Sequence, residues 1–226
     1  RFEFKLVGGS YRQEFVTDIN GEIDLSKLTP GAYEVRELEA PDGYLIDDAV
    51  RVVQVNPDEN ANFVFTNTPK PALRLIKTSS DGTRLGGVHF RIARIEDGTH
   101  YLDRITDDNG EINIAKLEPG VYSIKETATV ADHILDLQEY HMELFPGQTS
   151  TITIENQKRP NLIVYKKDAD TGDPIPDTVF LVKAADGHSV DEIRTDSEGK
   201  ATLSNLLPGV YEVSEKSVPA PWLMDA

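Results

Sequence analysis

The sequence has no cysteine, no long apolar run and comparatively few basic residues. Without cysteine there is no disulfide framework, no thiolate zinc site and no cysteine nucleophile. No apolar run approaches the roughly 18 residues that cross a bilayer, so we expect no membrane insertion in this segment. With 23 basic and 39 acidic residues the net charge is −16, which excludes an ordinary nucleic-acid binder because such proteins need a basic surface. The 226 residues suit one large domain or two to three small ones.

A repeat of constant length runs through the chain. The segment 17–33 recurs at 106–122 and again at 195–211. Each copy ends in Pro-Gly, an apolar residue and tyrosine, and the glycines are Gly31, Gly120 and Gly209. Their separations, 120 − 31 and 209 − 120, are both 89 residues. The chain is therefore an array of similar units.

Each unit is predicted to be all-β. Apolar and polar residues alternate at 73–75, 112–114 and 152–154, which is the period of a half-buried strand. Turn signals such as Asn109-Gly110 and Pro146-Gly147 separate the runs, and no long stripe has a helical period. This pattern favours a tandem array of small antiparallel β-sandwiches.

Proline-bearing linkers near residues 69 and 159 divide the chain into unit one (1–69), unit two (70–158) and unit three (159–226). Residues 2–4 align with 88–90, so unit one is expected to lack its first strand. Unit three ends before a counterpart of residues 63–67 and is expected to lack its last strand. We expect only unit two to be complete, and the chain to be a fragment of a longer array.

Polar residues alternate with apolar ones on strand faces that should point into the core. Lys77 shares a face with Leu73 and Leu75, because side chains two apart lie on the same side of a strand. The same argument turns other polar residues inward: Glu126 and Asn156 in unit two, Lys166 and Glu215 in unit three, and Glu37 and Asn67 in unit one.

Burial of these groups predicts unusual chemistry. Burial lowers the pKa of a lysine and raises that of a glutamate, so a neutral amine and a neutral acid can lie beside a carboxamide. The amine can attack the asparagine to form an amide and release ammonia, while the glutamic acid polarises the carbonyl and moves protons. The alternative for each set is a structural lysine–glutamate ion pair, with the asparagine capping a strand end.

Three motifs in order resemble a known family. The segment Glu37-Leu38-Glu39-Ala40-Pro41-Asp42-Gly43-Tyr44, the run 162–168 around Lys166 and the run 63–69 around Asn67 are similar to the glutamate, lysine and asparagine motifs of collagen-adhesin B-type domains. These are also called SpaA-type or prealbumin-like domains. The loop after the glutamate departs from this pattern in units two and three.

The resemblance implies an extracellular, cell-wall-attached protein of a Gram-positive bacterium, with repeats stacked as a stalk or pilus. It implies a lysine–asparagine isopeptide bond promoted by a catalytic glutamate, formed once per domain without a cofactor or metal. By position, Lys77, Glu126 and Asn156 complete this set in unit two, whereas the other units hold only Lys166 with Glu215 and Glu37 with Asn67. A turnover enzyme is not expected. The implied partners are adjacent repeats and, at a distance, a host matrix protein or glycan.

Two other function classes stay open from the sequence. The exposed faces of the repeats can themselves be an adhesive binding module for a host protein or glycan. The chain can also be a carbohydrate-binding or regulatory β-sandwich attached to a secreted enzyme. The stalk interpretation is favoured because the variable positions show no aromatic platform or metal site.

Other candidate sites receive structural interpretations. Asp168, Asp170 and Asp173 lack the closing glutamate of a calcium loop, so a solvated turn is expected. Tyr44 and Trp222, in the loops after the glutamates, are expected to pack at the edge of the core. The histidines show no zinc-ligand spacing and are expected at the surface: His89, His100, His133, His141 and His188.

Overall fold

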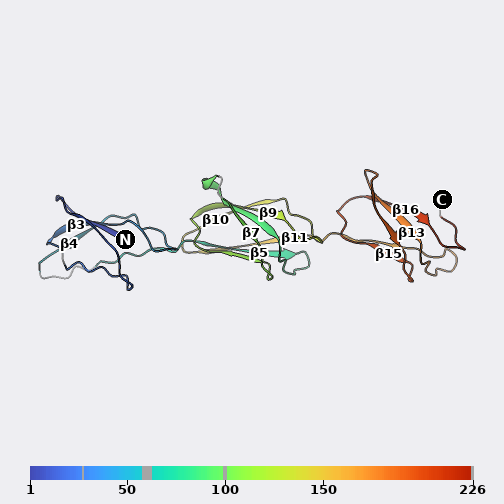
Figure 1. Ribbon diagram of the computed structural model, residues 1–226, viewed down its shortest axis with the longest axis horizontal. Coiled ribbons are helices and arrows are strands. Elements are labelled where there is room, and N and C mark those ends of the chain that lie inside the picture. The colour runs from blue at the N-terminus through green and yellow to red at the C-terminus, as the bar shows by residue number, and fades with distance from the viewer. Residues whose placement is uncertain (27, 58–62, 99–100, 225–226) are drawn as a thin grey trace.

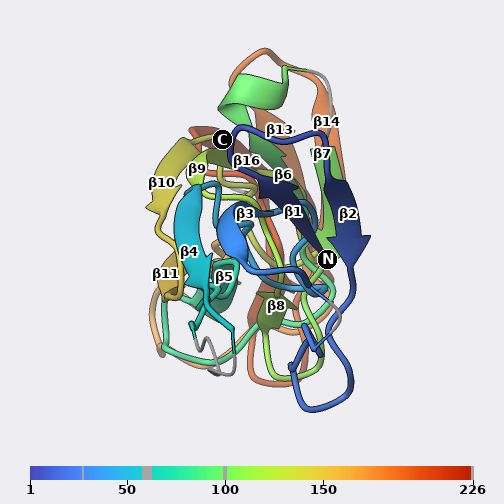
Figure 2. The ribbon, with the colours of Figure 1, turned by 90° about the vertical axis from the view of Figure 1, so that its left-hand side faces the viewer.

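The computed structural model describes residues 1–26, 28–57, 63–98 and 101–224. Its strands form three groups in a row along the long axis, with the N-terminus in one end group and the C-terminus in the other (Figure 1). In the end-on view of Figure 2 the three groups lie one behind another. The prediction of an all-β protein built largely from antiparallel sheets is confirmed.

Unit two consists of two sheets. One has the strand order β10-β9-β6-β7 and the other the order β11-β5-β8. The bounds are β5 Ala72–Ser79, β6 His89–Arg94, β7 Tyr101–Ile105, β8 Glu111–Ile114, β9 Gly120–Ala128, β10 Glu139–Leu144 and β11 Thr149–Asn156. A single 3₁₀ turn, η1 (Ile95–Asp97), follows β6. Within the described residues, no helix is long and apolar enough to span a membrane.

Unit one contains a single four-stranded antiparallel sheet of order β2-β1-β3-β4. Its strands are β1 Phe2–Leu6, β2 Arg12–Phe15, β3 Gly31–Glu37 and β4 Arg51–Val55. Shifted by 89 residues, β3 corresponds to β9 of unit two. Strand β1 corresponds to β6 with a shift of 88, because Phe2 lies opposite Glu37 as Phe90 lies opposite Glu126. Residues 2–4 therefore align with 90–92 and not, as expected from the sequence, with 88–90. Residues 22–25 and 63–67 correspond to β8 and β11, yet they are not strands.

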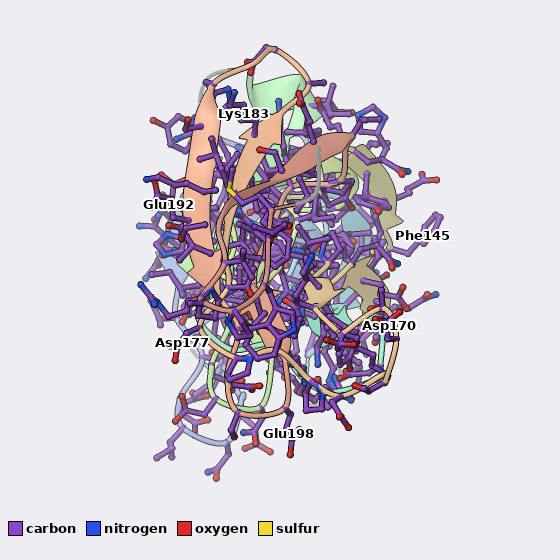
Figure 3. All side chains as sticks on the ribbon, turned by 90° about the vertical axis from the view of Figure 1, so that its right-hand side faces the viewer. Phe145, Asp170, Asp177, Lys183, Glu192 and Glu198 are labelled. Carbon is purple, nitrogen blue, oxygen red and sulfur yellow. The ribbon has the colours of Figure 1, made fainter. Side chains whose placement is uncertain are left out.

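Unit three has a two-stranded sheet, β12 (Leu162–Tyr165) with β15 (Lys200–Leu203). A three-stranded sheet of order β14-β13-β16 faces it, formed by β13 Val179–Ala184, β14 Ser189–Arg194 and β16 Tyr211–Ser217. In the view from the C-terminal end of the row, the acidic side chains of Asp177, Glu192 and Glu198 lie at the outline of the molecule (Figure 3). The net negative charge is thus carried partly on the exposed rim of this unit.

The core of unit two lies between its sheets and follows the alternation of the sequence. Strand β5 shows this most clearly, because every second residue from Leu73 to Ser79 is buried. The cluster around it joins side chains of both sheets, among them Phe90, Ile92, Ile124 and Ile154. The clusters of the two outer units contain fewer buried residues, in keeping with the smaller number of strands described in each.

The first and last strands of unit two are neighbours and run in the same direction. Strand β5 pairs in parallel with β11 along its whole length and antiparallel with β8 on its other side. The alternation of the sequence had predicted antiparallel sheets, so the parallel pair is a difference from that prediction. The parallel pair arises because the chain enters the unit at one end and leaves it at the other (Figure 1). The first and last strands in sequence therefore run in the same direction.

An ion pair crosses the junction between units one and two. Lys116 of unit two pairs with Asp42, in the loop after β3. Beside it Lys70, at the start of unit two, pairs with Glu118 of the same unit and donates its backbone N–H to the carbonyl oxygen of Gly43. The stem of Lys116 also passes Gly43 closely. These contacts hold the loop after Glu37 against the next unit.

Gly110 occupies a position in which a side chain would be harmful. It has a φ of 69°, and a Cβ there would lie 2.7 Å from the carbonyl oxygen of Lys77. Gly21 is the equivalent residue of unit one and also has a positive φ, of 81°, but a Cβ there would have no neighbour within 4 Å.

Replacing Gly110 with alanine should therefore destabilise its unit more than the Gly21→Ala control destabilises unit one. Both changes cost about 1–2 kcal/mol for the left-handed backbone, and the overlap with β5 adds about 1–3 kcal/mol in unit two alone. Hydrogen exchange resolved by unit measures both losses. Equal losses in the two variants would show that the approach of Gly110 to β5 is unimportant.

Candidate functional site

Three strands of unit two bring Lys77, Glu126 and Asn156 together in the core. They lie near the ends of β5, β9 and β11, and the exposed fractions of the three residues are 0%, 3% and 1%. Lys77 Nζ donates to Asn156 Oδ1 at 2.5 Å and lies 3.0 Å from Glu126 Oε2. Asn156 Nδ2 donates to Glu126 Oε1 at 2.6 Å. The carboxyl group of Glu126 thus contacts both the amine and the carboxamide.

Alternation along the strands explains why these polar groups meet. Lys77 follows Leu73 and Leu75 on the inner face of β5, while Glu126 follows Tyr122 and Ile124 on the inner face of β9. Because β5 and β9 belong to different sheets, their inward side chains meet across the sandwich.

The surroundings of the lysine disfavour its positive charge. Burial lowers the pKa of Lys77 below its ordinary value, while the hydrogen bond and charge of Glu126 act in the opposite direction. The Phe90 ring, whose centroid is 5.9 Å from Nζ, forms part of the apolar wall. Lys77 is thus biased toward the neutral amine, which is the form that can act as a nucleophile.

The same contacts orient the asparagine. Its Nδ2 also donates to Thr129 Oγ1 at 2.8 Å, so both amide hydrogens have acceptors and the carbonyl oxygen faces the lysine. A carboxyl group that touches nucleophile and leaving group together can carry a proton from one to the other. The arrangement is thus suited to joining Lys77 and Asn156.

Unit three brings together the two predicted residues that it contains. Lys166 Nζ lies 3.1 Å from Glu215 Oε2, and both side chains are largely buried. Lys166 follows β12 directly and Glu215 lies on β16, which are the positions of Lys77 and Glu126 shifted by 89 residues.

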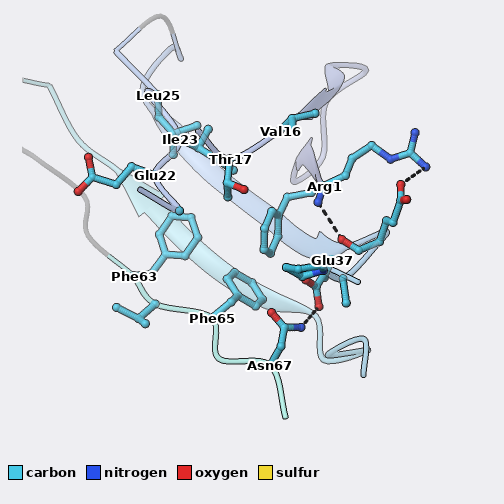
Figure 4. Close-up of a pocket in the computed structure, with 16 residues that line it drawn as sticks. Arg1, Val16, Thr17, Glu22, Ile23, Leu25, Glu37, Phe63, Phe65 and Asn67 are labelled. Atoms are coloured by element: carbon cyan, nitrogen blue, oxygen red, sulfur yellow. Dashed lines mark hydrogen bonds and ion pairs between the residues drawn. The ribbon is translucent and has the colours of Figure 1, made fainter. Parts of the chain in front are cut away.

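Unit one holds the complementary pair. Asn67 Nδ2 donates to Glu37 Oε2 at 2.6 Å, and the same oxygen accepts the backbone N–H of Asp47 at 2.8 Å. Figure 4 shows this pair at one end of a pocket beside Phe65. The asparagine–glutamate contact therefore occurs with or without a lysine in the unit.

A second buried polar contact, not predicted from the sequence, lies at one end of the site of unit two. His133 Nε2 lies 2.9 Å from Ser79 Oγ, and His133 Nδ1 lies 2.8 Å from Asp132 Oδ1. The chain of contacts from Asp132 through His133 to Ser79 resembles a hydrolase triad. Ser79 is fully buried, however, and has no access to a substrate. The contact instead fastens the loop after β9 to the end of β5.

The prediction that His133 lies at the surface is therefore wrong, since only 2% of it is exposed. His89, His141 and His188 are exposed, and His100 lies outside the described residues. The 89-residue period could have indicated that His133 packs at the edge of the core. It places His133 at the position of Tyr44 and Trp222, for which such packing was expected.

Trp222 makes the corresponding contact in unit three. Its Nε1 donates to Asp168 Oδ2 at 2.8 Å, and Asp168 is the counterpart of Ser79. We call this recurring contact the clasp. Trp222 is only half-buried, so its hydrogen bond rather than packing alone explains its place. The other oxygen of Asp168 accepts the backbone N–H of Asp170 and of Thr171, which forms a hydrogen-bonded turn. No group of three potential metal ligands occurs in the described part of the chain.

A double-mutant cycle of Ser79→Ala and His133→Ala tests the clasp of unit two. His133→Ala should cost roughly 1–3 kcal/mol of unfolding free energy, because it leaves a buried hydroxyl without its partner. The double variant should recover about 1 kcal/mol relative to the sum of the single losses. Denaturant unfolding measures the cycle, with the exposed residue His141→Ala as control. Strict additivity would contradict a direct contact.

The sequence is similar to that of a known domain family. The model of the SpaA prealbumin-like fold domain matches residues 1–69, 71–158 and 160–226. Colossin-A of Dictyostelium discoideum is 23% identical over 231 residues, covering 86% of this chain and 2% of its own length.

Two solved structures resemble the chain. The Bacillus anthracis TIE protein has a TM-score of 0.46 and 24% identity, covering 99% of this chain and 43% of its own. A streptococcal ancillary pilin has a TM-score of 0.40 and 23% identity, covering 87% and 69%. This chain thus spans a small part of Colossin-A and less than half of the TIE protein. The three matches to the domain model account for almost every residue, and the chain belongs to the SpaA-type, prealbumin-like domain family.

Proposed function

We propose that this chain is a structural segment of a stalk or pilus on the surface of a Gram-positive bacterium, stiffened by an amide bond between Lys77 and Asn156. The observation that carries the proposal is the contact set of unit two. A buried amine lies 2.5 Å from the oxygen of a buried carboxamide, and one carboxyl group contacts both.

The bond forms in a balanced exchange. Lys77 Nζ, as the neutral amine, attacks Cγ of Asn156, and the Cγ–Nδ2 bond breaks. Glu126 accepts a proton from Nζ and delivers one to Nδ2, which leaves as ammonia. Glu126 ends in its starting protonation state, and no oxidant, metal or cofactor takes part. Contact distances before reaction supply the proximity that accelerates such steps.

The position of the bond suits a load-bearing role. It joins the first and last strands of the unit, whose crosslinked residues are 79 apart in sequence. Force applied at the two ends of the unit then passes from β5 to β11 and bypasses the residues between them. Constraint of the unfolded chain by a loop of this length stabilises by about 4–5 kcal/mol.

The same chemistry makes this a single event rather than turnover. The product stays attached to the protein, and the glutamate meets no second substrate. In this proposal the partners are the neighbouring repeats, the protein is extracellular and attached to the cell wall, and any adhesive function lies elsewhere in the assembly.

The mass of the denatured protein tests the proposal. We expect the wild-type chain to be lighter than its sequence by about 17 Da, one ammonia. Lys77→Ala, Glu126→Ala and Asn156→Ala should each have the full mass of their sequences. Glu143→Ala, an exposed carboxylate on β10, is the matched control and should keep the deficit. A protease digest should yield one branched peptide that contains residues 77 and 156.

Two outcomes would contradict the proposal. A wild-type mass equal to the sequence would leave Lys77 and Glu126 as a buried ion pair. A deficit that survives in Glu126→Ala would remove the glutamate from the reaction.

A further inference from the structure

The loop after β9 supplies a second acceptor for the nitrogen that leaves Asn156 as ammonia. Thr129 directly follows β9, which ends at Ala128. Its Oγ1 accepts an N–H of Asn156 Nδ2 at 2.8 Å, while Glu126 Oε1 accepts from the same nitrogen at 2.6 Å. The leaving nitrogen is thus held by a carboxyl group on one side and by a hydroxyl on the other.

Unit one also gives this nitrogen two acceptors, but the second is a different group. Asn67 Nδ2 donates to Glu37 Oε2 at 2.6 Å and to the backbone carbonyl oxygen of Leu45 at 3.0 Å. The counterpart of Thr129 in unit one is Ala40, which has no hydroxyl. Two acceptors for the carboxamide are therefore common to both units, and a hydroxyl as the second acceptor is a feature of unit two.

Thr129 lies where the buried site approaches the surface. Lys77, Glu126 and Asn156 are at most 3% exposed, whereas Thr129 is half-buried. Ammonia released from Asn156 therefore begins its path beside a residue that is partly open to solvent.

The contact with Thr129 strengthens as the carbon–nitrogen bond breaks. In the carboxamide, Nδ2 of Asn156 is a neutral donor, and the net gain from such a hydrogen bond is modest. Once Nδ2 has taken up the proton that Glu126 delivers, it is a cationic donor, and charge-assisted hydrogen bonds are about twice as strong as neutral ones. Interactions that are stronger in the transition state than before reaction raise the rate. The hydroxyl therefore favours departure of the nitrogen more than it favours the starting contact.

The clasp fixes the loop that carries Thr129. The N–H of His133 donates to the carbonyl oxygen of Val130 at 3.1 Å, which closes a turn directly after Thr129. His133 Nε2 lies 2.9 Å from Ser79 Oγ, and Ser79 lies opposite Asn156 in the pairing of β5 with β11. Contacts thus lead from the end of β5 through the loop and back to the carboxamide.

The other side of the loop is fastened next to the asparagine. Ile134 donates its N–H to the carbonyl oxygen of Gln157 at 2.9 Å, and Arg159 Nε donates to that of His133 at 3.1 Å. The loop is therefore tied both to β5 and to the segment after β11. A misplacement of about 1 Å of a group in a reacting site is enough to slow a reaction strongly, so the ties of this loop bear on the reaction.

We propose that Thr129 is a catalytic residue of the amide-forming site, where it accepts a hydrogen bond from the departing nitrogen, and that His133 is its positioning residue. Nζ of Lys77 attacks Cγ of Asn156, and Glu126 carries a proton from Nζ to Nδ2. The Cγ–Nδ2 bond breaks and ammonia leaves, while Thr129 neither gains nor loses a proton. This inference rests on the proposed function, because it assigns further roles within the same reaction.

The rate of ammonia loss tests the role of the hydroxyl. The full chain is made in a short pulse of cell-free translation, samples are denatured in acid at intervals, and their masses are measured. Thr129→Val keeps the shape of the side chain but removes the acceptor, and it should slow the appearance of the deficit of about 17 Da by about tenfold or more. Thr129→Ser keeps the hydroxyl and should react within about threefold of the wild-type rate. Thr127→Val, the same change at an exposed position of β9, is the matched control and should leave the rate unchanged.

A second measurement separates the rate from folding. The same substitutions are placed in a Lys77→Met background, in which no amide can form, and unfolding by denaturant is followed. Each variant should be fully folded at the temperature of the reaction, so that loss of folded protein does not account for the slower reaction. A merely structural role of Thr129 would leave the rate per folded molecule unchanged.

Combined variants test the positioning role of the clasp. His133→Ala should slow the loss of ammonia by about threefold or more, since the loop is no longer joined to β5. Added to Thr129→Val, it should cause no further slowing, because it acts through a hydroxyl that is already absent. Effects that multiply in the double variant would overturn the positioning role and show that His133 acts by another route.

Other results would overturn the role of the hydroxyl. A wild-type rate in Thr129→Val, or a Thr129→Ser variant as slow as Thr129→Val, would remove the hydroxyl from the reaction and leave the proposed crosslink intact. Equal slowing by Thr127→Val would assign the effect to β9 in general. A wild-type chain that never loses ammonia would refute the proposed crosslink and this inference together.

Discussion

The double pairing of strand β5 is the constraint on which the structure of unit two depends. This strand is central in its sheet, with β8 on one side and β11 on the other. In unit one, residues 22–25 and 63–67 are not ordered into strands, although their sequences keep the same alternation. An isolated segment has no ladder partner for its backbone, so alternation alone does not make it a strand.

The buried polar set depends on the same strand. Lys77 is fully buried because β5 carries it between two sheets, and its amine keeps polar partners there because Glu126 and Asn156 surround it. A lone charge in this place would be costly. Unit three illustrates the intermediate case: its lysine and glutamate meet, but the side chains of β16 are more exposed than those of β9. Burial of the pair therefore increases with the number of strands that enclose it.

Much of the fold and of the buried polar set could be predicted from the sequence, because two periodicities are strong. The period of two along strands places Lys77, Glu126 and Asn156 inside, and the period of 89 aligns the units. The role of Thr129 and the burial of His133 are not evident from the sequence, since both residues lie in a loop whose path depends on tertiary contacts. Residue 129 is threonine only in unit two, with alanine and valine at its counterparts 40 and 218, so no repeat pattern marked it. The parallel pairing of β5 and β11 was missed for a related reason: strand direction follows from topology, not from local pattern.

The junction between units one and two differs in its charges from the next one. Lys116 and Asp42 form an ion pair across it, and Lys70 pairs with Glu118 beside it. Their counterparts at the next junction are Ala131, Arg159, Asn205 and Leu207, of which only the arginine is charged. Arg159 turns back to the carbonyl oxygen of His133 within unit two. Because exposed ion pairs weaken as salt rises, the contact of Lys116 with Asp42 is a part of the first joint that responds to ionic strength. Its counterparts at the second joint, Asn205 and Ala131, carry no charge. A row of related units thus has joints of unequal chemistry.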